Sequence, residues 1–131
     1  MNSRRRVNSD VRRLLVSATI DMNPAPKIVI ASDHGISIRC RDDISDAVGA
    51  SLGRGLILTE GDLGPDFFDL RTGLAGELIQ KFVNYRVRVA IILPMPAAHG
   101  ERFAELAHEH ATHPTVRFVH SIDEAIQWMH T

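Results

Sequence analysis

The segment Val87–Leu93 constrains the fold of this chain most strongly. Six of its seven residues are apolar, and Arg88 is the exception. A strand that is apolar on both faces is typical of a parallel sheet with helices on both sides. Leu56–Thr59 and Thr115–His120 are similar short apolar runs. Segments with helical periodicity separate these runs, and the alternation predicts an α/β domain.

A pair of antiparallel strands is predicted before these units. Lys27–Ser32 is rich in Ile and Val, Asp33-His34-Gly35 supplies turn residues, and Ile36–Arg39 alternates between apolar and polar side chains. These runs predict a β-hairpin, which makes the complete element order β-β-α-β-α-β-α-β-α. One hairpin followed by repeated βα units predicts a single domain with a mixed, mostly parallel sheet and right-handed crossovers.

Apolar residues at helical spacing predict four helices between and after the strands. The predicted helices cover Asp42–Leu52, a segment opened by Thr72 or Gly73, Glu101–Ala111, and a last segment capped by Ser121. Asp42 or Asp43 can cap the first helix. Glu124 lies three residues after Ser121, and this spacing predicts a capping box at the start of the last helix.

Charge divides the chain into two parts. Residues 1–23 carry five arginines and two aspartates, a balance of +3, whereas residues 24–131 carry ten basic and fourteen acidic side chains, a balance of −4. Pro24 and Pro26 mark the boundary, because proline holds the backbone extended. We therefore predict a flexible basic N-terminal extension over residues 1–26 and an α/β domain over residues 27–131. We expect nucleic acid to bind only to the extension, through Arg4, Arg5, Arg6, Arg12 and Arg13.

Several classes of protein are excluded by what the sequence lacks. No apolar run approaches the ~20 residues of a membrane span, so we expect no membrane partner and a cytoplasmic location. The single cysteine, Cys40, excludes an intramolecular disulfide. The sequence also contains no Gly-x-Ser-x-Gly, no Gly-Lys-Ser/Thr phosphate loop and no His-Glu-x-x-His motif. We accordingly expect no metal, no cofactor and no catalytic residue set.

The loops after the predicted strands are the best places for a functional site, because ligands of parallel sheets bind beyond the carboxyl ends of the strands. These loops are Asp33–Gly35, Glu60–Thr72 and Pro94–Gly100. The middle loop leads into a helix N-terminus, which favours anions. Thr72 lies there, and two interpretations stay open: its hydroxyl is a phosphorylation site, or it serves only as a helix cap.

We expect another protein to bind the loop and helix start at residues 60–76. Phe67 and Phe68 are adjacent, so in an extended segment one ring points inward and one outward; burial of both rings is the alternative. The chain is then a non-enzymatic regulatory or partner-binding module, with phosphorylation of Thr72 as a candidate switch. The residues expected to contact the partner are Phe67, Phe68, Asp69, Arg71, Thr72 and Gly73.

The alternative function is a small-molecule binding protein or enzyme that uses the same strand-end loops. Asp69, His34 or His99 would act as a base, and the helix N-terminus would hold an anionic substrate.

Two resemblances add to this interpretation. The runs Asp66–Glu77 and Gln80–Arg86 are similar to the characteristic segment of a bacterial family numbered 4180 among the domains of unknown function. The order of elements resembles, more faintly, that of STAS domains such as the anti-anti-sigma factors. In those proteins a kinase phosphorylates a serine at the start of a helix, and Thr72-Gly73 stands at the corresponding place here. The second resemblance implies a STAS-like fold and a regulatory role.

Overall fold

The computed structural model describes residues 28–131. The predicted extension over residues 1–26 and its arginines lie outside the described residues. Four parallel strands form the sheet, in the spatial order β1-β2-β3-β4. The strands are β1 (Ile28–Ile30), β2 (Gly55–Thr59), β3 (Arg88–Ile92) and β4 (Val116–Val119). The prediction of an α/β domain is confirmed, and the strand predicted from Val87–Leu93 lies between two neighbours inside the sheet.

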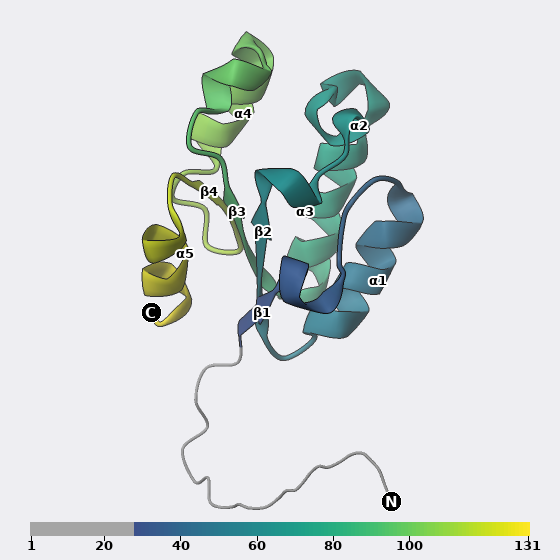
Figure 1. Cartoon of the computed structure of the whole chain (residues 1–131), viewed down its shortest axis with the longest axis vertical. Coiled ribbons are helices and arrows are strands. Elements are labelled where there is room, and N and C mark those ends of the chain that lie inside the picture. Colours follow the sequence, from purple (N-terminus) through teal and green to yellow (C-terminus); the bar gives the residue numbers. More distant parts are fainter. Residues whose placement is uncertain (1–27) are drawn as a thin grey trace, which may run out of the picture.

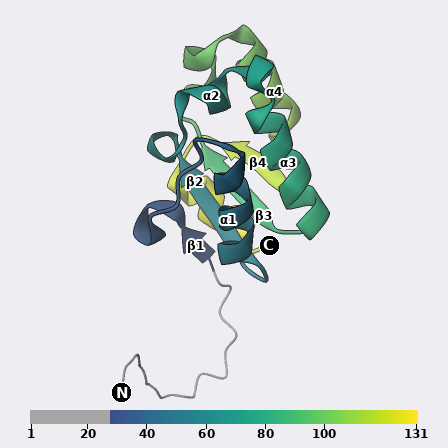
Figure 2. The same ribbon diagram turned by 90° about the vertical axis from the view of Figure 1, so that its right-hand side faces the viewer.

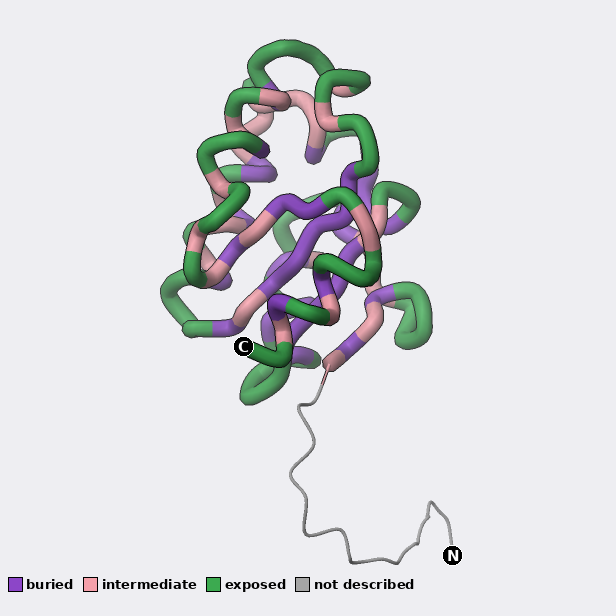
Figure 3. The backbone as a smooth tube through the Cα atoms, turned by 90° about the vertical axis from the view of Figure 1, so that its left-hand side faces the viewer, coloured by how far each residue is buried: buried purple, intermediate pink, exposed green. Residues whose placement is uncertain are grey.

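Helices cover both faces of the sheet, as the apolar strands require. Figure 1 shows α1 (Arg41–Ser51) and α3 (Leu74–Tyr85) on one side of the sheet and α5 (Ile122–Met129) on the other. The helix α4 (Glu101–Glu109) packs its buried Phe103 into the same apolar cluster as α1 and α3. The strands between these layers are mostly buried (Figure 3).

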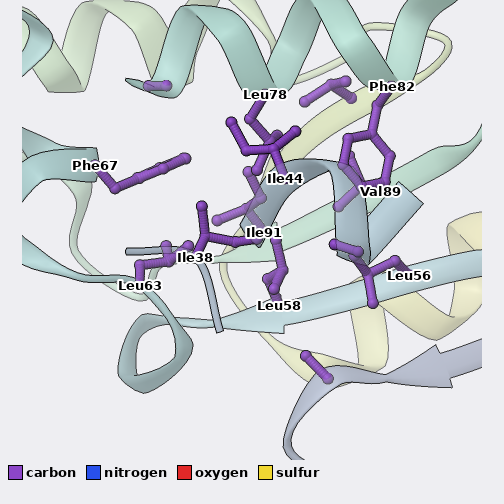
Figure 4. Packing of buried hydrophobic residues seen from close by; sticks show 14 of the residues in the cluster. Ile38, Ile44, Leu56, Leu58, Leu63, Phe67, Leu78, Phe82, Val89 and Ile91 are labelled. Carbon is purple, nitrogen blue, oxygen red and sulfur yellow. The ribbon is translucent and has the colours of Figure 1, made fainter. Parts of the chain in front are cut away.

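Alternate strand residues divide the core into two clusters. Leu56, Leu58, Val89 and Ile91 face α1 and α3 (Figure 4), in the larger cluster. The side chains between them face α5, where a smaller cluster comprises Ile57, Ala90, Ile92, Val119, Ala125 and Trp128. Alternation along a strand places successive side chains on opposite faces of the sheet. Both faces of the sheet are therefore buried against helices.

The predicted β-hairpin is wrong. Gly35 takes the left-handed conformation expected of a turn residue (φ 68°), but it ends the short 3-10 helix η1 (Ala31–His34) rather than a hairpin turn. Beyond Gly35, Ile38 forms a single parallel β-bridge with Leu63 instead of pairing with β1. Ile38 N–H donates to the Asp62 carbonyl (2.8 Å), and Gly64 N–H donates to the Ile38 carbonyl (2.9 Å). The alternation in Ile36–Arg39 thus serves to bury Ile38 in the core.

Two of the predicted caps differ from the structure in detail. The helix α1 has Cys40 at its N-cap position, and the carboxylate of Asp43 accepts from the backbone N–H of Arg39 (2.8 Å). Ser121 caps α5 as predicted, by accepting from Glu124 N–H (3.2 Å). The Glu124 carboxylate reaches back to the N–H of His120 (2.8 Å) rather than to that of Ser121. Across residues 28–131, no helix has the length and apolar character to cross a membrane.

Candidate functional site

The segments after β2 and β3 meet at the carboxyl edge of the sheet. Thr59 and Ile92 are paired at the ends of these strands. Thr59 leads into the 3-10 helix η2 (Glu60–Asp62), and a short loop after β3 leads into η4 (Pro96–His99). Glu60 Oε2 lies 2.5 Å from His99 Nε2, in a hydrogen bond that spans 39 residues of sequence. This bond ties the two strand-end segments together.

Aromatic rings surround His99. Its imidazole stacks on the ring of Phe68, with centroids 3.8 Å apart and planes 9° from parallel. Phe103 contacts both rings, at centroid distances of 5.2 Å from Phe68 and 6.0 Å from His99. The His99 side chain is only 19% exposed. Stacking and the bond to Glu60 together hold the imidazole in one orientation.

The expectation for Phe67 as a partner contact is wrong. Phe67 and Phe68 lie in the short helix α2 (Pro65–Phe68), which Pro65 opens at its first position. Successive helical residues diverge by about 100° rather than pointing to opposite sides. Phe67 is buried in the core, at the end where Ile38 and Leu63 lie (Figure 4). Phe68 is half-buried and packs edge-on against Phe67, so it keeps one surface for contacts.

A pocket of about 660 Å³ opens beside this aromatic cluster. Its apolar wall comes from the rings of Phe68 and Phe103, and its other wall carries charged side chains of both signs. The charged or ionisable residues that line it are Asp69, Arg71, His99, Glu101 and Arg102. The pocket therefore offers a small apolar surface together with two arginines.

Asp69 and Arg71 form a two-pronged ion pair at the rim of this pocket. The guanidinium of Arg71 donates to both carboxylate oxygens of Asp69 at 3.0 Å, and the Arg71 backbone N–H donates to Oδ1 at 3.1 Å. The side-chain and backbone hydrogen bonds from Arg71 lower the pKa of Asp69 below its ordinary value. The Asp69 carboxylate orients the Arg71 guanidinium, and its lowered pKa makes it a weaker base than an unpaired aspartate.

Thr72 lies one residue before Gly73, the N-cap residue of α3, and its hydroxyl binds the backbone at the start of this helix. Its hydroxyl oxygen accepts from the backbone N–H of Leu74 (3.2 Å). The hydroxyl proton lies within reach of two carbonyls, those of Asp66 (2.7 Å) and Asp69 (2.8 Å). Gly73 follows with φ 78°, in the left-handed region that glycine adopts without strain, and α3 begins at Leu74. The prediction that the Thr72 hydroxyl satisfies an N–H of the first turn is confirmed.

His34, a candidate base, does not line this pocket, and neither do Cys40 and Asp62. His34 is exposed on η1, which lies low in Figures 1 and 2 while α2 and α4 lie at the top. Cys40 is an exposed free thiol before α1. Asp62 turns its carboxylate to Thr59, accepting from the backbone N–H (2.8 Å) and the hydroxyl (2.9 Å). Within the described range, no group of three or more His, Cys, Asp or Glu side chains is arranged to hold a metal ion.

Sequence reasoning placed Glu60 in a candidate loop without giving it a role, and it did not place Arg102 or Phe103 at the site. The signal that points to Glu60 and His99 is topological, because both follow buried runs that become neighbouring parallel strands. Arg102 and Phe103 lie in the first turn of α4, three and four residues after the end of η4. They reach the pocket because η4 places α4 directly over the carboxyl edge.

Comparison with family models places the chain in a known family. Residues 24–129 match the model described as "Domain of unknown function (DUF4180)", and the chain belongs to this family. A search of curated proteins and a search of solved structures each found no match. The match includes the segment from Asp66 to Arg86 that carries α2 and α3.

Proposed function

We propose that this protein binds a small molecule at the carboxyl-edge pocket, with His99 as the residue that exchanges a proton or a hydrogen bond with it. The observation that carries this proposal is the hydrogen bond between Glu60 and His99, stacked on Phe68. A carboxylate on one ring nitrogen fixes the tautomer and orientation of an imidazole, and leaves the other nitrogen for a ligand. Among the described residues, Nδ1 of His99 has no hydrogen-bond partner.

The lining of the pocket supports a ligand with an apolar or planar body and a carboxylate. Phe68 and Phe103 supply faces and edges against which such a body can pack. Arg71 is already oriented by Asp69, and Arg102 is exposed at the start of α4. A guanidinium binds a carboxylate through two parallel hydrogen bonds. The chemistry proposed for His99 is acid–base exchange with the bound molecule.

Thermal unfolding of the full chain against a panel of small carboxylates tests this proposal. A ligand that binds only the folded state raises the midpoint of unfolding, and the rise grows with the logarithm of its concentration once that concentration exceeds Kd. We expect Arg102→Gln to reduce that rise and His99→Gln to abolish it, with His108→Gln on the exposed side of α4 as the matched control. A panel without any shift, or shifts that persist in both pocket variants, would count against this function.

A second candidate is the partner-binding module expected from the sequence, using Phe68, Asp69, Arg71, Thr72 and Gly73. Two observations favour it: the Arg71 side chain is 91% exposed although Asp69 orients it, and Met95, just before η4, is 69% exposed. The resemblance to STAS domains extends this candidate to a phosphorylation switch at Thr72, and we propose a cytoplasmic location for either function. Arg71→Ala and Thr72→Glu would then each change the amount of a specific protein captured by the full chain.

A further inference from the structure

A second pocket lies at the opposite edge of the sheet, where the strands begin. Its volume is about 510 Å³. Arg54 lies in the turn between α1 and β2, Arg86 in the turn between α3 and β3, and Arg88 is the first residue of β3. The pairing of Gly55 with Arg88 brings these two turns side by side. Three arginines from two crossover connections therefore line one pocket.

The ionisable side chains that line this pocket are three arginines and His130. No Asp or Glu side chain lines it, and none of the three arginines forms an ion pair with another residue of 28–131. The body of the chain is otherwise acidic, with a balance of −4 over residues 24–131. Grouping like charges is unfavourable unless an anion joins them.

Arg86 has an unusual backbone conformation for its residue type. Its φ of 57° and ψ of 41° lie in the left-handed region, where it ends α3. It is the one non-glycine residue of 28–131 with a positive φ, and each of the other positions of that kind holds glycine. Glycine adopts this conformation without strain. Retaining arginine here at a cost in backbone energy points to a role for its guanidinium.

Arg88 is held in place by its surroundings. Its Nη1 donates to the carbonyl of Trp128 (3.1 Å), and its guanidinium lies over the Trp128 ring, 5.3 Å from the centroid. Ile28 and Met129 supply an apolar wall beside it. One arginine is thus oriented in advance, while Arg54 and Arg86 are exposed and form no ion pair with another residue of 28–131.

We propose that this pocket binds a phosphate dianion, either free or as the phosphate group of a small ester, through Arg54, Arg86 and Arg88. Guanidinium groups present paired N–H donors that match phosphate oxygens, and several of them can share one dianion. The apolar wall of Ile28 and Met129 is the contact for the body of an ester. This site is separate from the carboxyl-edge pocket and does not depend on its function.

Titration of the full chain with inorganic phosphate at constant ionic strength tests the proposal. Trp128 is the single tryptophan of the sequence and contacts Arg88, so its fluorescence reports on the pocket. We expect saturable binding that Arg54→Gln weakens about tenfold, since a hydrogen bond to a charged group contributes about that much. Arg39→Gln is the matched control, because Arg39 is an exposed arginine outside both pockets.

Arg86→Gly separates ligand binding from folding. Relief of the backbone strain should leave the midpoint of thermal unfolding unchanged or raised. We expect the same variant to weaken phosphate binding about tenfold. An arginine that serves only to neutralise the helix end predicts instead a lower midpoint and unchanged phosphate binding, which would overturn the proposal.

Two further titrations identify the source of the phosphate and examine the N-terminal arginines. Phenyl phosphate that binds more tightly than inorganic phosphate indicates an ester ligand, and equal affinities indicate the free anion. If Arg12→Gln/Arg13→Gln weakens binding as much as Arg54→Gln, the N-terminal segment is the phosphate site and the proposal is wrong. Binding of a single-stranded oligonucleotide without binding of phosphate would also overturn it.

Discussion

The imidazole of His113 accepts a hydrogen bond from the backbone N–H of Val116, and its Nδ1 lies 3.1 Å from the Val116 nitrogen. The same Nδ1 accepts the N–H of Thr115 at 3.0 Å. The His113 side chain therefore binds the backbone at the start of β4 (Val116–Val119). Only an unprotonated Nδ1 can accept these two hydrogen bonds. Burial lowers the pKa of His113 below 6.5, and the neighbouring His110 and Arg117 lower it further. Protonation of Nδ1 would remove the acceptor for both bonds.

This arrangement predicts that acid weakens the fold. Because the pKa of His113 is lower in the folded chain, the unfolded chain binds more protons as the pH falls through about 6.5. The contribution of His113 to the free energy of unfolding is full above that pH and decreases below it. Urea unfolding between pH 7.5 and 5 should show this decrease, and His113→Asn should flatten it, since the asparagine oxygen can replace Nδ1. The exposed His108→Asn is the control, and equal slopes in the wild type and His113→Asn would contradict the prediction.

The Thr72 cap should stabilise the start of α3. Replacing Thr72 with alanine removes the acceptor for Leu74 N–H and should lower the free energy of unfolding by about 1 kcal/mol. Thr72→Ser keeps the hydroxyl and should retain most of the stability. Urea denaturation of the three proteins is the measurement. Equal losses in the alanine and serine variants would show that the methyl group, not the hydroxyl, stabilises this turn.

Two glycines three residues apart should respond to alanine in opposite directions. Gly73→Ala places a side chain at φ 78°, with its Cβ 3.4 Å from Nη2 of Arg41, and should destabilise by about 1 kcal/mol. Gly76 lies exposed inside α3 with open space around it, so Gly76→Ala should stabilise by about 0.5 kcal/mol. Thermal unfolding of both variants shows whether each midpoint falls or rises relative to that of the wild type. A stabilising Gly73→Ala would contradict the left-handed conformation at this position.

The two phenylalanines of α2 should also differ in their effects. Phe67 is fully buried, so Phe67→Ala should cost about 3–5 kcal/mol of folding free energy. Phe68 is half-buried, so Phe68→Ala should cost less folding free energy than Phe67→Ala. The same variant should reduce the rise in unfolding midpoint caused by a ligand of the carboxyl-edge pocket. Phe67→Leu keeps most of the apolar volume and serves as a folded control if the alanine variant fails to fold. The idea is falsified if Phe68→Ala proves the more destabilising of the two.

The fold was predictable where apolar pattern alone decides the structure. The apolar run Val87–Leu93 predicts an interior strand, and the apolar spacing after Gly73 predicts a helix; the structure confirms both. Ile36–Arg39 was misjudged because alternation reveals a strand-like backbone but not its partner, and Ile38 pairs with Leu63 in parallel. An extended backbone at Phe67 and Phe68 is the wrong prediction, because Pro65 opens a helical turn there, although Phe67 does point inward.

The candidate site was less predictable because its members come from distant parts of the chain. Asp69, Arg71 and Thr72 form local bonds that short-range patterns indicate. Glu60 and His99 meet only because β2 and β3 are neighbours, and no local pattern encodes a bond across 39 residues. The parallel topology indicates that a site lies at the carboxyl edge of the sheet. Which histidine lies in that site depends on the positions of α2 and α4, which the sequence pattern does not give.

The sheet order β1-β2-β3-β4 has a consequence for how the chain folds during synthesis. Each new strand is added beside the one made just before it, but the paired residues lie far apart in sequence, as Ile28 and Gly55 or Gly55 and Arg88 do. Parallel pairing over such separations forms slowly, because the segment between the strands must close first. Within the described residues, the face that holds Ile57 and Ala90 is covered by α5, which the ribosome makes after every strand. A nascent chain that has completed β4 but not α5 exposes this apolar face, and that is the stage at which a chaperone would protect it.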